Sequence, residues 1–270
     1  MRGSRNMGRV HTVNRVDPGE VIWRYTDFAK FYSLLQKSAL YFCPALLLRK
    51  SEPFELQVPV AHRDEWRGNT VNQLRGVGYT EEAIAEIIVE ASKYTDHSPQ
   101  WALNCWHRNQ IESFAMWKVF VGQPEGVAIK TTFDRVRLAF NEDGGQPVTA
   151  GNVHYIDYLR GRYSEQVIAQ GYEPIFHKAH FYSYEREFRL GINPHFESLP
   201  TEDPDWYERP RTKESLSQKV DLETLIEEVR VSPYAAPWFF EMVEQLVRNT
   251  IGPKVIVTKS TVFNTEFLTR

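Results

Sequence analysis

Two glutamates and an arginine occupy alternate positions in one segment that is rich in aromatic residues. The letters YSYEREFRL at residues 182–190 alternate well enough to predict a strand. Alternate side chains of a strand share a face, so we expect Glu185, Glu187 and Arg189 on one face. The opposite face is expected to join the core through Tyr184, Phe188 and Leu190. Two carboxylates roughly 6.6 Å apart beside a guanidinium can hold a cationic or hydroxyl-bearing ligand, and the alternative is a solvated face with local ion pairs.

A second group of polar residues lies in the letters NCWHRNQIESFAMWK, where a strand is expected to turn into a helix. Amides at the start of a helix point outward and favour anions, so such turns often carry sites. Ser113 is expected to cap the helix, and Glu112 directly precedes it. His107 is a candidate for acid–base chemistry or a structural residue. The rings of Trp106 and Trp117 serve either stacking or core packing.

The first expected strand carries an arginine between two large rings. Residues 22–26 read IWRYT, with Arg24 between Trp23 and Tyr25. A guanidinium there can bind a phosphate or carboxylate through two parallel hydrogen bonds. The alternative is an edge-strand arginine whose stem packs on Trp23.

Strands and helices are mixed along the chain without regular alternation. This pattern predicts the α+β class, with a mixed, mainly antiparallel sheet core, flanking helices and a single domain. The expected strands cover residues 22–26, 39–43, 103–106, 126–131, 153–158, 182–190, 228–231 and 254–258. The expected helices follow the cap Asp27, begin at Thr80, and cover residues 113–121 and 236–249. Residues 49–78 are expected to be irregular, and residues 200–215 to form a solvated loop.

Composition limits the class of protein. The chain has 270 residues and a net charge of -3, so nothing global demands nucleic acid or an anionic membrane. No apolar run reaches the roughly eighteen residues of a membrane helix, so no membrane partner is expected. The two cysteines, Cys43 and Cys105, lack metal-binding spacing, so we expect no metal and two buried thiols in a reducing, cytoplasmic setting. Residues 1–20 are basic and are expected to form a flexible arm ahead of a domain at residues 21–270.

Three stretches carry a resemblance to a known family. The first runs from YTDF to LYF within residues 25–42, the second from CWH through ES and MWK to GVAI within residues 105–129, and the third joins HK at 177–178 to YEREFR at 184–189. Together they resemble the bacterial domain-of-unknown-function family 2971, and the middle motif is the most specific. The chain departs from that family at Cys43, where a small hydroxyl residue is usual, and at residues 51–55, where SEPFE replaces a DPFE-like stretch. The resemblance implies no activity, because the family has none established.

Residue types on successive expected strands carry a second resemblance. They are Arg24 or Tyr25, then Tyr41, then Glu187, and Glu185 completes a Glu-x-Glu motif. This order resembles that of ADP-ribosyltransferases, which place an Arg or His on a first strand, a Ser, Thr or Tyr on a second, and a Glu on a later one. The resemblance implies NAD as a co-substrate. A guanidinium would bind the pyrophosphate, a ring would stack on nicotinamide, and a carboxylate would stabilise the oxocarbenium-like state.

The resulting expectation is an NAD-dependent, ADP-ribosyltransferase-like enzyme, a toxin or phage-defence effector, that modifies a protein or nucleic-acid acceptor. The expected catalytic residues are Glu187 and Glu185. The expected cofactor-binding residues are Arg24, Tyr25, Tyr41, Trp106 and Arg189, and the other cleft candidates are His107, Glu112, Ser113, Trp117 and Lys178. The alternative is a non-catalytic module that binds a nucleotide or single-stranded nucleic acid by stacking and cation contacts. A third interpretation is a metal-free hydrolase that uses His107 and Glu112.

Overall fold

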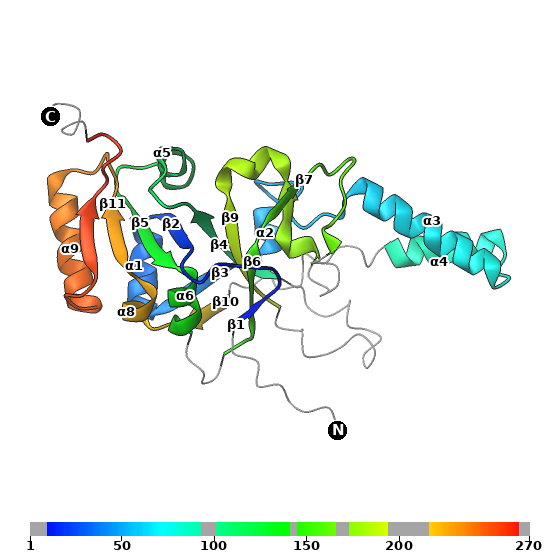
Figure 1. The fold of residues 1–270 in the computed structure, drawn as a ribbon, viewed down its shortest axis with the longest axis horizontal. Coiled ribbons are helices and arrows are strands. Elements are labelled where there is room, and N and C mark those ends of the chain that lie inside the picture. Colours follow the sequence, from blue (N-terminus) through cyan, green and yellow to red (C-terminus); the bar gives the residue numbers. More distant parts are fainter. Residues whose placement is uncertain (1–9, 93–100, 141–144, 166–172, 194–215, 265–270) are drawn as a thin grey trace, which may run out of the picture.

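One mixed sheet of ten strands is the framework of the chain (Figure 1). The structure is a computed structural model, and it describes residues 10–92, 101–140, 145–165, 173–193 and 216–264. The ten strands are β1 (Val10–Thr12), β2 (Val21–Asp27), β3 (Ala39–Pro44), β4 (Ala102–Arg108), β5 (Gly126–Thr132), β6 (Val148–Asn152), β9 (Glu187–Ile192), β10 (Leu216–Lys219), β11 (Glu228–Val231) and β12 (Ile256–Lys259). A second, two-stranded sheet consists of β7 (His154–Ile156) and β8 (His177–Ala179).

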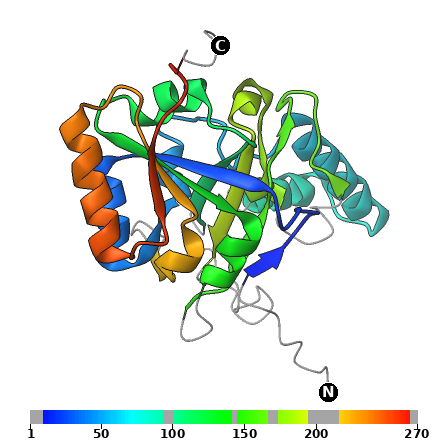
Figure 2. The ribbon, with the colours of Figure 1, turned by 60° about the vertical axis from the view of Figure 1, so that its left-hand side comes forward.

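Most neighbouring strands run antiparallel, in the order β1-β6-β9-β4-β2-β5-β11-β12, with β10 joined through β3 to β4. The pairs β1–β6 and β11–β12 are parallel. The expected α+β fold with a mixed, mainly antiparallel sheet and flanking helices is therefore confirmed. Figure 2 shows the helices that flank the sheet.

The longer helices follow from local signals in the sequence. Helix α1 (Phe28–Lys37) begins at Asp27, whose carboxylate accepts from the Lys30 amide at 2.8 Å, so the expected cap is confirmed. Helix α9 (Pro237–Thr250) has proline at its first position, where no amide partner is lost. The two helices pack together through the rings of Phe28 and Phe239, 5.4 Å apart. The shorter helical elements are α2 (Ala45–Leu48), α5 (Phe114–Met116), the π-helical turn η3 (Trp117–Val121), α6 (Phe133–Ala139), the 3-10 helices η4 (Glu173–Phe176) and η5 (His180–Glu185), and α8 (Leu222–Leu225).

The main sheet forks along one edge of β4. Near its start, Leu103 of β4 pairs with Cys43 of β3, whereas near its end His107 pairs with Trp23 of β2. Strands β2 and β3 therefore separate along the middle of β4. The backbone carbonyl of Cys105 faces this gap, and a side chain rather than a strand satisfies it, as described below.

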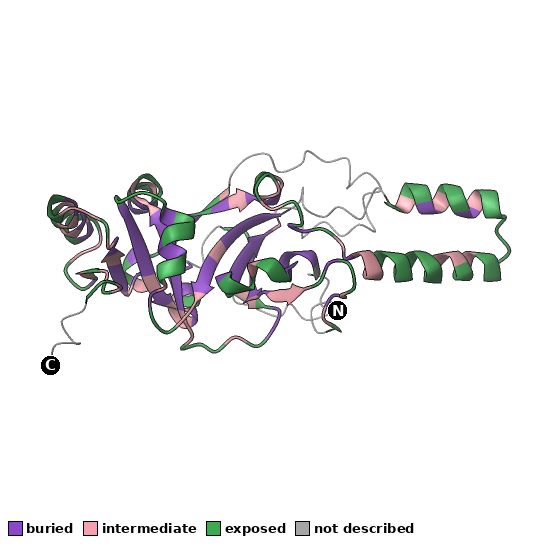
Figure 3. Cartoon of the chain, turned by 90° about the horizontal axis from the view of Figure 1, so that it is seen from above, coloured by how far each residue is buried: buried purple, intermediate pink, exposed green. Residues whose placement is uncertain are grey.

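A pair of helices projects from the body of the molecule (Figures 1 and 3). These helices are α3 (Val60–Gly76) and α4 (Glu81–Ser92). Helix α4 was expected and is confirmed, with Ile84 and Ile88 buried. Helix α3 contradicts the irregular structure expected for residues 49–78, and it has no buried residue. A helix without a buried face shows no apolar periodicity, which is why the sequence pattern missed it.

Two further expectations are corrected. Residues 10–12 do not belong to a flexible arm, because β1 pairs with β6 and the Val13 amide donates to Ala150 at 3.0 Å. The strand expected at 182–190 begins only at Glu187, because residues 180–185 form η5. Tyr184 is accordingly 48% exposed instead of facing the core, while Phe188 and Leu190 are buried as expected. The expected loop at 200–215 lies outside the described residues.

Candidate functional site

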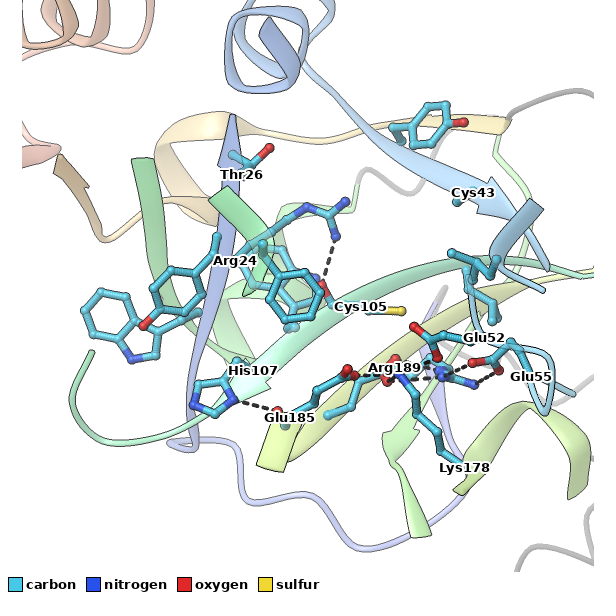
Figure 4. A pocket seen from close by; sticks show the side chains of 18 of the residues that line it. Arg24, Thr26, Cys43, Glu52, Glu55, Cys105, His107, Lys178, Glu185 and Arg189 are labelled. Atoms are coloured by element: carbon cyan, nitrogen blue, oxygen red, sulfur yellow. Dashed lines mark hydrogen bonds and ion pairs between the residues drawn. The ribbon is translucent and has the colours of Figure 1, made fainter. Parts of the chain in front are cut away.

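A cavity of about 300 Å³ lies in the fork between β2 and β3 (Figure 4). The two predicted catalytic residues, Glu185 and Glu187, line it. All five predicted cofactor-binding residues line it as well: Arg24, Tyr25, Tyr41, Trp106 and Arg189. Of the other candidates, His107 and Lys178 line the cavity. The fork thus brings together residues from four strands of the main sheet, from η5 and from the small sheet.

Lys178 of β8 joins three carboxylates at one end of the cavity. Its ammonium lies 2.5 Å from Glu185 Oε2, 3.2 Å from Glu187 Oε2 and 2.8 Å from Glu52 Oε2. The side chains of Lys178, Glu185 and Glu187 are each at most 8% exposed. The alternative interpretation of a solvated strand face is therefore wrong, because these charges are buried and paired with one another.

Arg189 binds the carboxylates of the same cluster. Its guanidinium is fully buried, and its Nε donates to Glu187 Oε1 at 2.8 Å. Its Nη1 donates both to Glu55 Oε1 and to the Ile175 carbonyl at 2.8 Å. A guanidinium with fixed, multiple donors suits this place, because each buried carboxylate oxygen needs a partner.

The environment separates the ionisation of the two glutamates. Burial and the neighbouring charge of Glu187 raise the pKa of Glu185 to about 7, although Lys178 opposes the rise. Burial alone would also raise the pKa of Glu187, but Arg189 and Lys178 hold it well below its ordinary value. At neutral pH Glu187 is therefore a fixed anion, whereas Glu185 can gain or lose a proton.

Negative charge exceeds positive charge in this cluster. Four carboxylates, those of Glu52, Glu55, Glu185 and Glu187, meet the two cations Lys178 and Arg189. Burial raises the pKa of Glu55 although Arg189 opposes the rise, and a proton on this carboxyl would relieve part of the excess. A cationic group on a ligand would do the same.

The opposite wall of the cavity carries a cation without an anionic partner among the described residues. Arg24 of β2 donates from Nη1 to the Cys105 carbonyl at 3.0 Å, and its guanidinium lies 5.9 Å from the centre of the Trp106 ring. Burial lowers the pKa of Arg24, which shows the cost of keeping this charge in place. An anionic ligand group would lower that cost.

The predicted rings of the cavity differ in what they offer. Trp106 is 2% exposed and faces Arg24, so its role is to support the guanidinium and not to stack on a large ligand. The Tyr25 hydroxyl accepts from the Ser113 amide at 2.7 Å. Tyr41 is 45% exposed at the cavity and is the predicted ring that remains accessible.

Two thiols also line the cavity, and neither was among the site residues expected from the sequence. Cys43 of β3 and Cys105 of β4 are free and half-buried. Burial raises the pKa of both thiols, and the charge of Glu187 adds to the rise at Cys105. Both are therefore weak nucleophiles at neutral pH.

His107 serves the backbone of the turn before β9. A carbonyl can only accept, so the Nδ1 of His107 carries the proton that it donates to the Glu185 carbonyl at 2.5 Å. Burial lowers the pKa of this imidazole, which is neutral at pH 7. Its Nε2 is buried and has no hydrogen-bond partner among the described residues. Since Glu112 does not line the cavity, the hydrolase interpretation that pairs it with His107 loses its geometric basis.

Three predicted site residues lie outside the cavity. Ser113 caps α5, accepting from the Met116 amide at 3.4 Å, so its expected capping role is confirmed. Glu112 is buried and accepts from Trp117 Nε1 at 2.9 Å and from the Thr261 amide at 2.7 Å. This carboxylate attaches the segment after β12 to the start of α5, so Glu112, Ser113 and Trp117 are structural here.

Sequence reasoning missed Glu52 and Glu55 as site residues. Both lie in the segment between α2 and α3, where no periodicity marks them. The available signal was the SEPFE stretch at residues 51–55, which the predicted resemblance to family 2971 aligns with a DPFE-like stretch. Leu56, directly after it, has a left-handed backbone with φ of 55°, and Arg49 donates to the carbonyls of Glu55 and Leu56 at 2.8 and 3.2 Å.

Comparisons with known proteins gave no match to a protein-family model, to a curated protein or to a solved structure. The likeness to family 2971 therefore stays a prediction that depends on the motifs given above. No helix in the described part of the chain has the length and hydropathy needed to cross a membrane.

Proposed function

We propose that this protein cleaves the bond between nicotinamide and ribose in NAD and transfers the ADP-ribosyl group to an acceptor. One observation carries the proposal: the Arg24 guanidinium, which has no anionic partner among the described residues, lines the same cavity as a buried excess of carboxylates. NAD has the complementary charges, a pyridinium cation on nicotinamide and an anionic pyrophosphate. In this arrangement Arg24 binds the pyrophosphate, and the glutamates face the pyridinium and the adjoining ribose.

The two glutamates then act differently. Glu187 accepts three hydrogen bonds from charged donors, two from Arg189 and one from Lys178, which leaves it a fixed negative charge. That charge stabilises the oxocarbenium-like ribose as nicotinamide leaves. Glu185 is bonded through Oε2 to Lys178, and in this proposal the same carboxylate also accepts from a ribose hydroxyl or from the acceptor.

The reaction balances within these groups. The bond from ribose C1′ to the nicotinamide ring nitrogen breaks, and both electrons go to the nicotinamide, which leaves neutral. A lone pair of the acceptor forms the new bond to C1′, and the proton of the acceptor passes to Glu185. Since this requires ionised Glu185, a pKa of about 7 leaves the base available near neutral pH.

The cavity volume of about 300 Å³ suits one nucleotide half of NAD, because it lies at the lower end of the range for small-molecule sites. We propose that the nicotinamide half enters the cavity. The exposed Tyr41 ring lies where it can contact the half that stays outside.

Release of nicotinamide from NAD tests the proposal. We expect release by the wild type, and a loss of about 100-fold or more in both Glu187→Gln and Glu185→Gln. Glu228→Gln is the matched control, because Glu228 is also buried and bonds an arginine two residues later, at 2.9 Å, outside the cavity. Absence of both release and NAD binding in the wild type would overturn the proposal.

The same cavity favours a second candidate, a non-catalytic module that binds a nucleotide. The engagement of Glu187 by Arg189 and Lys178 favours it, because a carboxylate already paired twice has little capacity left for a substrate. Calorimetry separates the two functions. NAD that binds without turnover, with an affinity that Glu187→Gln leaves intact but Arg24→Gln reduces, would establish the binding module.

A further inference from the structure

The turn that carries the two glutamates is conformationally strained. Arg186, between Glu185 and Glu187, has a left-handed backbone with φ of 43° and ψ of 51°, which a residue with a side chain adopts at a cost. Such outliers persist where the surroundings hold them, and they gather at functional sites. The contacts that hold this one therefore show how the carboxylate pair is kept in place.

Protein groups bind each side of the turn. The Glu185 carbonyl accepts from His107, and the Arg186 carbonyl accepts from the Arg108 amide at 2.9 Å. The remaining amide, that of Glu187, donates to the hydroxyl of Tyr155 at 2.6 Å. These two carbonyls and this amide therefore all have hydrogen-bond partners, and the partner of the amide is the side chain of Tyr155.

Tyr155 stands where a strand partner is missing. The pairing of β6 with β9 ends at Phe188, and the Glu187 carbonyl still accepts from the Val153 amide at 3.0 Å. The Glu187 amide faces the same side, beyond the end of β6, where the Tyr155 hydroxyl replaces the missing ladder carbonyl. In the small sheet Tyr155 is the register partner of Lys178, so two adjacent residues of β7 and β8 hold Glu187 by its amide and by its carboxylate.

We infer that Tyr155 is a positioning residue, which fixes the Glu187 amide and thereby keeps Glu187 and Glu185 on the shared Lys178 ammonium. The small β7–β8 sheet supplies both contacts. The consequence for turnover rests on the proposed function, whereas the consequence for the carboxylates does not.

Loss of the Tyr155 hydroxyl has a defined effect on the carboxylates. In Tyr155→Phe the Glu187 amide has no acceptor, so the turn relaxes and Glu187 moves away from Lys178. Glu185 then loses a neighbouring negative charge and keeps the ammonium to itself, so its pKa falls, while the pKa of Glu187 rises. The charged groups that face Glu185 are Lys178 of β8, Glu187 of β9 and Glu52 of the segment before α3. His107 of β4 is neutral and reaches only the carbonyl.

Carboxyl NMR on the full chain, labelled at glutamate, tests the inference without a ligand. Glu185→Gln and Glu187→Gln assign the two signals. We expect the two titration midpoints in Tyr155→Phe to move toward each other by about one pH unit. Tyr163→Phe is the control, because it removes a partly buried hydroxyl bond of 3.0 Å, to the Gln57 carbonyl, away from the turn. If Tyr155→Phe fails to fold, 3-fluorotyrosine at position 155 weakens the acceptor while keeping the shape, and a smaller shift of the same sign is expected.

The outcomes separate this inference from the proposed function. Shifted midpoints together with a fall of about 10-fold in the rate of nicotinamide release, at nearly unchanged KM, support both. Shifted midpoints in a protein that releases no nicotinamide support the positioning role and overturn the proposed function. Unchanged midpoints, with a loss of stability alone, would show that Tyr155 is merely structural and overturn the inference.

Discussion

The guanidinium of Arg24 lies 5.9 Å from the centre of the buried Trp106 ring, and this ring is its support in place of a carboxylate. A cation held by a ring face and one carbonyl, with no anion beside it in the described part of the chain, is costly inside a protein. The sheet creates this situation, because the fork leaves the Cys105 carbonyl without a strand partner and the Arg24 side chain fills the gap.

Arg24→Gln therefore separates binding from stability. We expect the affinity for NAD to fall by about 10-fold or more, because a charge-assisted bond to pyrophosphate is lost. We expect the free energy of unfolding to stay unchanged or to rise, because an unpaired charge is removed while the amide can still donate to the Cys105 carbonyl. Calorimetric titration and urea unfolding measure the two quantities. Unchanged affinity together with a large loss of stability would show that Arg24 is structural.

The raised pKa of Glu185 has a consequence for stability that needs no ligand. Burial favours the neutral carboxyl in the folded state, so its contribution is fully present below the unfolded pKa of about 4.3 and is lost as the pH rises through about 7. Relative to Glu185→Gln, we expect the wild type to lose about 3 kcal/mol of unfolding free energy between pH 4.5 and pH 8. Urea unfolding of both proteins across this range measures the difference. Parallel curves would show that Glu185 ionises normally.

Periodicity in the sequence located part of the main sheet, but it located neither β1, β6 and β10 nor the partners of the site residues. Strands β2, β4 and β5 were predictable, because their apolar residues are buried and show it in the pattern. The turn at residues 182–186 was not, because η5 and a strand have the same alternating letters over so short a stretch. Glu52 and Glu55 reach Lys178 and Arg189 from a non-periodic segment more than a hundred residues away in the sequence. Pairings of this kind depend on the register of distant strands, which local patterns do not contain.

We expect Arg189 to contribute more to the free energy of unfolding than a surface ion pair among the described residues does. It is fully buried between Glu55 and Glu187, so Arg189→Met removes the paired cation of Glu55 and leaves Glu187 with Lys178 alone. We expect a loss of about 3–5 kcal/mol at pH 8 and a smaller loss at pH 5, because burial raises the pKa of Glu55 and a proton on this carboxyl removes the charge that the substitution leaves unpaired. Arg137→Met is the control, because its bond to Asp134 joins side chains that are 50% and 43% exposed and should contribute about 0.5 kcal/mol or less. Equal losses at the two pH values would contradict the assignment.

The projecting helix α3 should be the least protected long helix of the described chain. It has no buried residue, whereas α1 buries Phe31, Leu34 and Leu35 against the core. Helices without tertiary packing are marginal in water, so we expect the amides of α3 to exchange with deuterium at least about 100-fold faster than those of α1. Exchange followed by mass spectrometry at two protein concentrations measures this ratio. If the amides of α3 are as protected as those of α1 at both concentrations, intrinsic helix propensity and the contacts with α4 are enough to stabilise α3. Protection that appears only at the higher concentration would mean that a second copy covers α3, and the exposed Trp66 ring would then supply a fluorescence signal for that association.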